Sequence, residues 1–133
     1  ILGKLNTQLK SDFEAFSNVE VREFCSQKEL WALYMRSDIA ITRAGTTSLA
    51  EQDLFDLKLI MVPIPRTHDQ FANAKRYVEH RNGILLDQDS PEFKANLLAE
   101  LLKLKNFKKT ITQKDIKTAI SEPKNQILSD MLG

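Results

Sequence analysis

The sequence has little of what several classes of protein require. A single cysteine among 133 residues cannot build a disulfide framework, so we expect a protein of a reducing compartment such as the cytoplasm. Four glycines and four prolines are too few for a disordered or collagen-like chain. No apolar run approaches the roughly 18 residues that a membrane-spanning helix needs. Nineteen basic residues nearly balance eighteen acidic ones, and the net charge of +1 gives no overall field to attract nucleic acid.

What the sequence does contain is an alternation of short apolar runs and longer amphipathic stretches. The apolar runs predict strands at 1–2, 19–24, 38–42, 59–62 and 84–86. The amphipathic stretches predict helices at 7–16, 45–55, 69–80 and 93–102, and short helices at 115–120 and 124–132. A further helix is predicted to begin at the capping box formed by residues 26–29. Gly83 is expected to end one helix in the left-handed conformation, and Ser90 to cap the next. Such alternation predicts an α/β fold: a Rossmann-like, doubly wound parallel sheet with helices on both faces.

We assign residues 1–102 to the α/β domain and residues 103–133 to a helical extension that packs on the same domain. Residues 1–2 have the character of a strand end, so we expect the domain to be truncated at its N-terminus. After residue 103 the chain is polar and rich in lysine. These lysines have few aromatic neighbours, which favours a solvated face over a nucleic-acid site. They are Lys103, Lys105, Lys108, Lys109, Lys114 and Lys117.

The most informative stretch follows the strand at 38–42, because sheets of this kind bind ligands at the carboxyl ends of their strands. Gly45 allows a sharp turn there, and Arg43 adds a permanent cation. The residues after the turn carry hydroxyl groups at the start of a helix: Thr46, Thr47 and Ser48. Amide groups in the first turn of a helix lack intrahelical partners and carry the positive end of its dipole. This arrangement suits a phosphate group.

Glu51 lies on the second turn of the same helix, where its carboxylate can accept hydrogen bonds from two vicinal sugar hydroxyls. The same residues also have a purely structural interpretation. In that interpretation Thr46 caps the helix, Arg43 is a surface cation and Glu51 is solvated. A glycine followed by two threonines is far less specific than a complete phosphate-binding loop, so the spacing leaves both interpretations open.

A second group of polar side chains precedes the helix at 69–80. Asp69 and Gln70 have the polar groups that orient a hexose through its hydroxyls. The alternative is that Asp69 or Thr67 caps the helix and that Gln70 is exposed. His68 is a candidate general base by residue type alone, because no acidic partner is evident.

Cys25 follows the strand at 19–24 and is expected at the same edge of the sheet. No basic neighbour is evident in the sequence, so a nucleophilic role is not indicated. No paired cysteines, regularly spaced histidines or clustered carboxylates support a metal site.

Three segments carry a resemblance to a known family. They are MRSDIAITRAGTTSLAE at 35–51, KLIMVP at 58–63 and QFANA at 70–74. In this order they resemble the C-terminal domain of glycosyltransferase family 28, and the similarity covers roughly residues 1–102. Members of this family have a GT-B fold, in which two Rossmann-like halves meet and the C-terminal half binds the donor nucleotide. The family's glycine-rich strand, loop and helix, which grip the diphosphate, would precede Ile1.

The resemblance implies a donor-binding site. Its residues are Cys25, Arg43, Gly45, Thr46, Thr47, Ser48, Glu51, Asp69, Gln70 and Asn73. Backbone near Cys25 would hold the uracil, and Glu51 would bind the ribose hydroxyls. The turn at 45–48, supported by Arg43, would face the diphosphate and the sugar. Residues 69–70 would contact the transferred sugar, with Asn73 on the helix beside them.

By the same resemblance, the parent protein is a UDP-sugar-dependent hexosyltransferase. It would transfer a sugar, with inversion, from UDP-N-acetylglucosamine or a related donor to a lipid-linked or other acceptor. The UDP-sugar is a co-substrate, and no cofactor is implied. An acceptor-binding half outside this chain would supply the catalytic base and any peripheral attachment to the inner face of the membrane, so this chain alone would be inactive. Two alternatives remain: the donor-binding subunit of a split two-chain transferase, and a non-catalytic nucleotide-sugar-binding module.

Overall fold

The computed structural model describes residues 1–3 and 5–120 of the chain. Its helices are α1 (Thr7–Glu14), α2 (Gln27–Arg36), α3 (Thr46–Leu54), α4 (His68–His80), α5 (Phe93–Lys103) and α6 (Gln113–Ile120). Its strands are β1 (Ile39–Thr42), β2 (Lys58–Met61) and β3 (Ile84–Leu85). The strands form one parallel sheet in the order β1-β2-β3. The chain is therefore a Rossmann-like α/β protein, as the sequence predicts.

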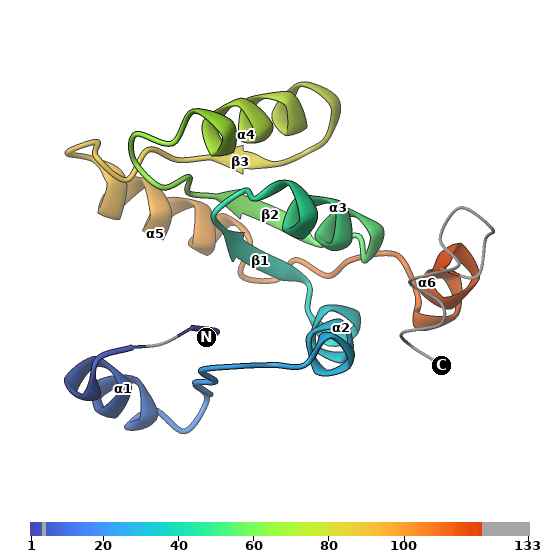
Figure 1. Cartoon of the computed structure of the whole chain (residues 1–133), viewed down its shortest axis with the longest axis horizontal. Coiled ribbons are helices and arrows are strands. Elements are labelled where there is room, and N and C mark those ends of the chain that lie inside the picture. The colour runs from blue at the N-terminus through green and yellow to red at the C-terminus, as the bar shows by residue number, and fades with distance from the viewer. Residues whose placement is uncertain (4, 121–133) are drawn as a thin grey trace.

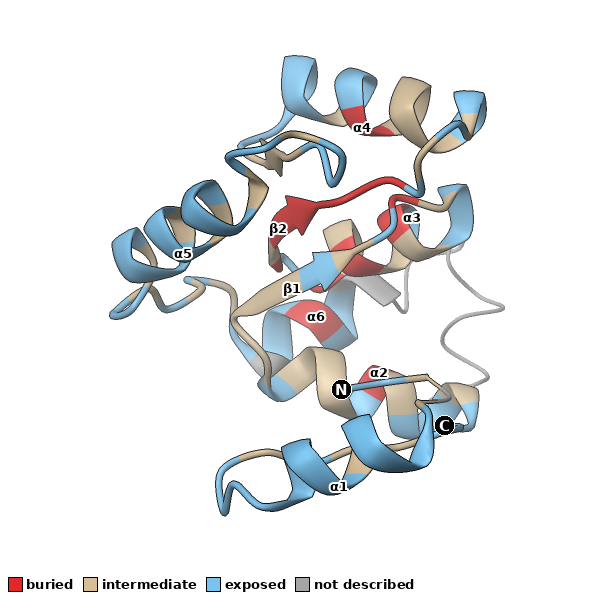
Figure 2. Cartoon of the chain, turned by 90° about the vertical axis from the view of Figure 1, so that its left-hand side faces the viewer, coloured by how far each residue is buried: buried red, intermediate tan, exposed pale blue. Residues whose placement is uncertain are grey.

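Helices cover both faces of the sheet. α3 connects β1 to β2 and α4 connects β2 to β3, and these two helices lie on one side, with α5 on the other (Figures 1 and 2). Two successive right-handed crossovers in the same direction place their helices on the same face. The loops that enter α3 and α4 therefore start at the same edge of the sheet, where β1 and β2 have their carboxyl ends.

The strands predicted at 1–2 and 19–24 are wrong as continuous strands. They are reduced to one parallel bridge between Leu2 and Arg22. Next to this bridge, the Gly3 amide donates to the Arg22 carbonyl at 2.9 Å, and Gly3 has a φ of 131°, which takes the backbone out of the extended conformation. Two segments that pair only with each other form a marginal sheet. Among the described residues the sheet thus has three strands where the sequence predicts five.

The capping box that the sequence predicts at the start of α2 is confirmed. Ser26 Oγ accepts from the Glu29 amide at 3.2 Å, and the Glu29 carboxylate accepts from the Ser26 amide at 2.8 Å. The predicted cap at Ser90 is wrong, because α5 begins at Phe93 with Glu92 in the cap position. Ser90 Oγ instead accepts from the Glu92 amide at 3.3 Å and stabilises the turn before the helix.

Gly83 does not end α4 in the left-handed conformation, so that prediction is also wrong. The cap residue is Arg81, and Gly83 has no positive φ. The glycine is required by close packing instead. A β-carbon at this position would lie 2.8 Å from Met61 Cε and 2.9 Å from Tyr77 Cδ1, so a larger residue would force the side chains of Met61 and Tyr77 to move.

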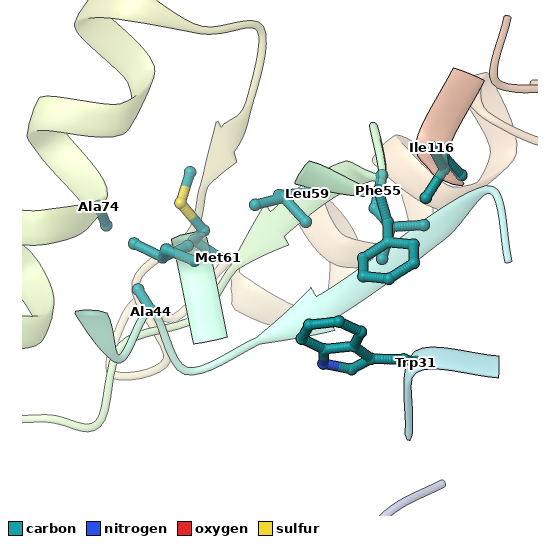
Figure 3. Close-up of a cluster of buried hydrophobic side chains, with 9 residues drawn as sticks. Trp31, Ala44, Phe55, Leu59, Met61, Ala74 and Ile116 are labelled. Carbon is teal, nitrogen blue, oxygen red and sulfur yellow. The ribbon is translucent and has the colours of Figure 1, made fainter. Parts of the chain in front are cut away.

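The hydrophobic core lies around two aromatic rings. Trp31 of α2 and Phe55 after α3 are fully buried, and their ring centroids are 5.5 Å apart in an edge-to-face arrangement. Figure 3 shows Leu59 of β2 and Ile116 of α6 in the same cluster. Because Ile116 is fully buried there, α6 belongs to the core of the α/β domain. The boundary at 102/103 stays a prediction, and the helix predicted at 124–132 lies outside the described residues.

One lysine of the polar segment before α6 is part of the fold. Lys109 Nζ donates to the carbonyl of Tyr34 at 2.8 Å and to that of Phe55 at 3.1 Å. Burial lowers the pKa of Lys109, and the hydrogen bond from its backbone amide holds the pKa of Asp38 below the usual value. The prediction of a solvated lysine face is therefore wrong for Lys109, which ties the segment to the ends of α2 and α3.

The free edge of β1 faces a groove of about 410 Å³. One wall is β1, where Ile41 is 54% exposed, and the opposite wall is the bridged pair formed by Leu2 and Arg22. Leu33 and Tyr34 of α2 also line it. A parallel sheet is normally covered on both faces and continued at its apolar edges, so this groove is an unusual feature.

Candidate functional site

The loop between β1 and α3 turns at Ala44 and not at Gly45. Ala44 is fully buried with a φ of 65°, a left-handed conformation that costs a non-glycine residue about 1–2 kcal/mol. Gly45 has an ordinary φ of −65°, so the prediction that it makes the sharp turn is wrong. A β-carbon on Gly45 would meet nothing within 4 Å. The packing of this chain therefore does not require glycine at position 45.

The N-terminus of α3 lacks a side-chain cap. Gly45 is the cap residue and makes no side-chain hydrogen bond, and Thr46 is already the first helical residue, so Thr46 does not cap the helix. The first turn also contains no acidic residue. Thr46 and Thr47 are exposed, and Ser48 is half-buried. Free amide groups and the positive end of the helix dipole therefore face the edge of the sheet, where an anion can bind.

Two side chains of α4 hold the neighbouring loops. Asn73 Nδ2 donates to Thr46 Oγ1 at 3.0 Å and to the Ala44 carbonyl at 3.4 Å. Gln70 Oε1 accepts from the Ile64 amide at 2.7 Å, and Gln70 is half-buried, so the alternative of a simply exposed side chain is wrong. Because Thr46 Oγ1 accepts from Asn73, its own proton is free to donate to a ligand. The structure thus brings Thr46 and Asn73 together, and Gln70 lies one turn before Asn73 on α4.

Arg43 joins three segments at the same edge. Its Nη1 donates to the Val62 carbonyl at 3.1 Å and to Gln88 Oε1 at 2.6 Å. These bonds connect the end of β1 to the end of β2 and to the chain that follows β3. Arg43 is exposed, but these two hydrogen bonds fix the position of its guanidinium beside the loop. Nothing in the sequence pattern pointed to Gln88.

Glu51 of α3 is tied to the beginning of α2. Its Oε1 accepts from Gln27 Nε2 at 3.1 Å, and both residues are half-buried. The interpretation of Glu51 as a purely solvated residue is therefore wrong. Gln27 was missed by sequence reasoning; the available signal was its place directly after the capping residue Ser26, at the carboxyl edge of the expected sheet.

Two of the predicted site residues, Cys25 and Asp69, make no contact with the loop between β1 and α3 through any hydrogen bond found among the described residues. Cys25 is half-buried in the loop before α2. The pKa of Arg22 is raised, first by its hydrogen bond to Glu20 and then by its interaction with Cys25, so the expectation that Cys25 has no basic neighbour is wrong. Asp69 is exposed inside the first turn of α4 and does not cap it, and Thr67 in the cap position makes no side-chain cap bond.

Two negative findings apply to residues 1–3 and 5–120. No group of three or more metal-ligating side chains occurs among them. None of their helices is long and apolar enough to cross a membrane. A second groove, of about 310 Å³, lies between α3 and α4; Thr46 and Asn73 line it near the carboxyl edge, and Arg76 and His80 line it farther along α4.

The fold, with its ligand-accessible loops at the carboxyl ends of β1 and β2, defines a Rossmann-like α/β domain. The family model for the glycosyltransferase family 28 C-terminal domain matches residues 2–130, and the chain belongs to this family. The match extends through the described part of the C-terminal extension, in agreement with the burial of Ile116 in the core.

Several curated relatives carry the name UDP-N-acetylglucosamine–N-acetylmuramyl-(pentapeptide) pyrophosphoryl-undecaprenol N-acetylglucosamine transferase. The chain is 34% identical over 112 residues to that of Neisseria meningitidis serogroup C, which covers 82% of the chain and 30% of the relative. It is 32% identical over 101 residues to that of Aquifex aeolicus, and the match covers 71% of the chain and 29% of the relative. It is 28% identical over 133 residues to that of Flavobacterium psychrophilum, and the match covers 95% of the chain and 36% of the relative. The chain thus spans about a third of the length of these relatives.

Proposed function

We propose that this chain binds the donor of an inverting hexosyltransferase, which is UDP-N-acetylglucosamine or a related UDP-sugar. The observation that carries the proposal is the N-terminus of α3, which has no side-chain cap, has Arg43 braced beside it and has Glu51 one turn further on. Family membership and the name of the relatives support a UDP-sugar over other phosphorylated ligands.

In this proposal the donor spans the loops in a defined order. The backbone around Cys25 holds the uracil, and Glu51 accepts hydrogen bonds from the ribose hydroxyls. The first turn of α3 and the Thr46 hydroxyl bind the diphosphate, with Arg43 supporting the loop. Asp69 contacts the transferred sugar through its exposed carboxylate, and Gln70 contacts it through its amide protons, since its oxygen already accepts from the Ile64 amide.

The proposed chemistry requires stabilisation of a leaving group. When the acceptor oxygen attacks the anomeric carbon, the bond to the diphosphate breaks and UDP carries the negative charge away. Fixed amide dipoles at the start of α3 stabilise that charge without having to reorient. No residue of this chain is assigned to proton transfer. The base belongs to an acceptor-binding half outside residues 1–133, so this chain alone is expected to be inactive.

The groove beside β1 fits one further parallel strand of the domain. Its walls are the free edge of β1 and the parallel bridge between Leu2 and Arg22, which lie on opposite sides of the gap. Gln52, which lines the groove, is only 6% exposed, and its Oε1 has no hydrogen-bond partner among the described residues. A strand placed here would join the two parts into one sheet. In the proposal it precedes Ile1 and carries the family's glycine-rich loop.

The acceptor-binding half is the main partner in this proposal. It belongs either to the same polypeptide or to a separate subunit, and it provides any peripheral attachment to the inner face of the membrane. A non-catalytic nucleotide-sugar-binding module is the remaining alternative. Transfer activity that returns when a completing half is added identifies a transferase, whereas donor binding without any completing half identifies a module.

Calorimetric titration of the folded chain with UDP, UDP-N-acetylglucosamine and UDP-galactose tests the proposal. We expect UDP to bind and one of the two UDP-sugars to bind more tightly than UDP, since the sugar adds contacts to Asp69 and Gln70. The preferred sugar then gives the donor. A chain that is folded by circular dichroism but binds none of the three ligands contradicts the proposal.

A further inference from the structure

One hydrogen bond joins the two segments that are proposed to hold the nucleoside. Gln27 Nε2 donates to Glu51 Oε1 at 3.1 Å across 24 positions of sequence, in a partly buried setting. Gln27 is the first residue of α2, and the reciprocal bonds between Ser26 and Glu29 fix the backbone on which it stands. Gln27 therefore approaches Glu51 from a rigid position, directly after the loop that contains Cys25.

The chemistry of this pair leaves the carboxylate available for a ligand. A carboxylate has about four acceptor sites, and the Gln27 amide occupies one of them on Oε1. Two vicinal hydroxyls need two of the sites that remain. The donor is also uncharged, so it orients Glu51 without neutralising it, whereas a lysine or arginine in its place would form an ion pair and compete with the hydroxyls.

We propose that Gln27 is a positioning residue, which holds the Glu51 carboxylate ready for the two vicinal hydroxyls of the nucleotide ribose. The inference rests on the proposed function. Glu51 has several rotatable bonds, and an ordered side chain avoids the entropy loss that binding would otherwise impose. Loss of the bond is therefore expected to weaken UDP binding about three- to tenfold.

The test uses a ligand pair that isolates the ribose contact: UDP and 2′,3′-dideoxy-UDP, each titrated into the full chain by calorimetry. Gln27→Met keeps the length of the side chain and removes its donor, and Gln27→Glu places a second carboxylate against Glu51. Gln8→Met is the matched control, because Gln8 also donates to a carboxylate, that of Asp12 at 2.7 Å, but on the exposed helix α1. Thermal unfolding shows that each variant is folded.

We expect Gln27→Met to weaken the binding of UDP three- to tenfold and to leave the affinity for the dideoxy analogue unchanged. Gln27→Glu should have a larger effect of the same kind, and Gln8→Met should have none. Equal losses for both ligands, or no loss for either, overturn the positioning role while the proposed function stands. A wild-type chain that binds both ligands equally overturns the ribose contact and with it the positioning role, whereas the proposed function fails only if neither ligand binds.

Discussion

Replacement of Glu51 with alanine should lower the affinity of the chain for UDP by about ten- to a hundredfold. A hydrogen bond to a charged group contributes about 1.5–3 kcal/mol, and the carboxylate is proposed to accept two from the ribose. Two such bonds at full strength would exceed a hundredfold, and the expected loss is smaller because Glu51 is only half-buried and water partly replaces its carboxylate. Calorimetric titration of wild type and variant with UDP measures the difference.

The same substitution should leave folding nearly unchanged. Alanine is the best helix former, and the one side chain that bonds the Glu51 carboxylate among the described residues is Gln27, whose amide can turn to solvent. Glu14→Ala, on exposed helix α1, is the control and should bind UDP like the wild type. Unchanged UDP affinity in Glu51→Ala would remove Glu51 from the ribose site.

Gly45→Ala should weaken UDP binding by about 1–3 kcal/mol, or roughly five- to 150-fold. The new methyl group meets no atom of the chain within 4 Å, so any clash that it causes is with the ligand. Since Gly45 already has a φ of −65°, alanine fits its backbone. The cost to folding should stay below about 1 kcal/mol, the usual range for a cap substitution. Chemical denaturation and calorimetry on the same samples separate the two effects.

Gly83→Ala serves as the control, because it should lower stability without affecting UDP binding. Its methyl group would lie 2.8 Å from Met61 Cε and 2.9 Å from Tyr77 Cδ1, so we expect a loss of about 1–3 kcal/mol in unfolding free energy. UDP affinity of the folded protein should be unchanged. A Gly45→Ala variant that binds UDP as tightly as the wild type would show that the diphosphate does not approach this loop.

Local patterns predicted most of the regular structure. The β1 and β2 strands and helices α2 and α4 appear within one or two residues of their expected bounds, because apolar periodicity and the capping box act over short distances. The pattern at 19–24 failed for a tertiary reason. A strand needs a run of backbone bonds to a neighbouring strand, and this segment makes only a single bridge, to Leu2.

The candidate site was also predicted in part: its loops follow from local sequence patterns, and its tertiary contacts do not. The loops that carry it follow from the order of strands and helices, and Arg43, Thr46 and Glu51 lie where that order predicts. The turn at Ala44 did not follow from the sequence, since a left-handed alanine is stabilised only by tertiary bonds such as that from Asn73. The bond between Gln27 and Glu51 likewise depends on how α2 packs beside α3.

The central proposal is that a nucleoside diphosphate binds at the start of α3, and nuclear magnetic resonance of the isotope-labelled chain tests it most directly. On titration with UDP, the amide signals of residues 45–48 should shift and saturate together with those of Gln27 and Glu51. The signals of Arg76 and His80, in the groove between α3 and α4, should stay unchanged. Shifts confined to Arg76, His80 and their neighbours on α4, or no shifts at saturating UDP, would contradict the proposed site.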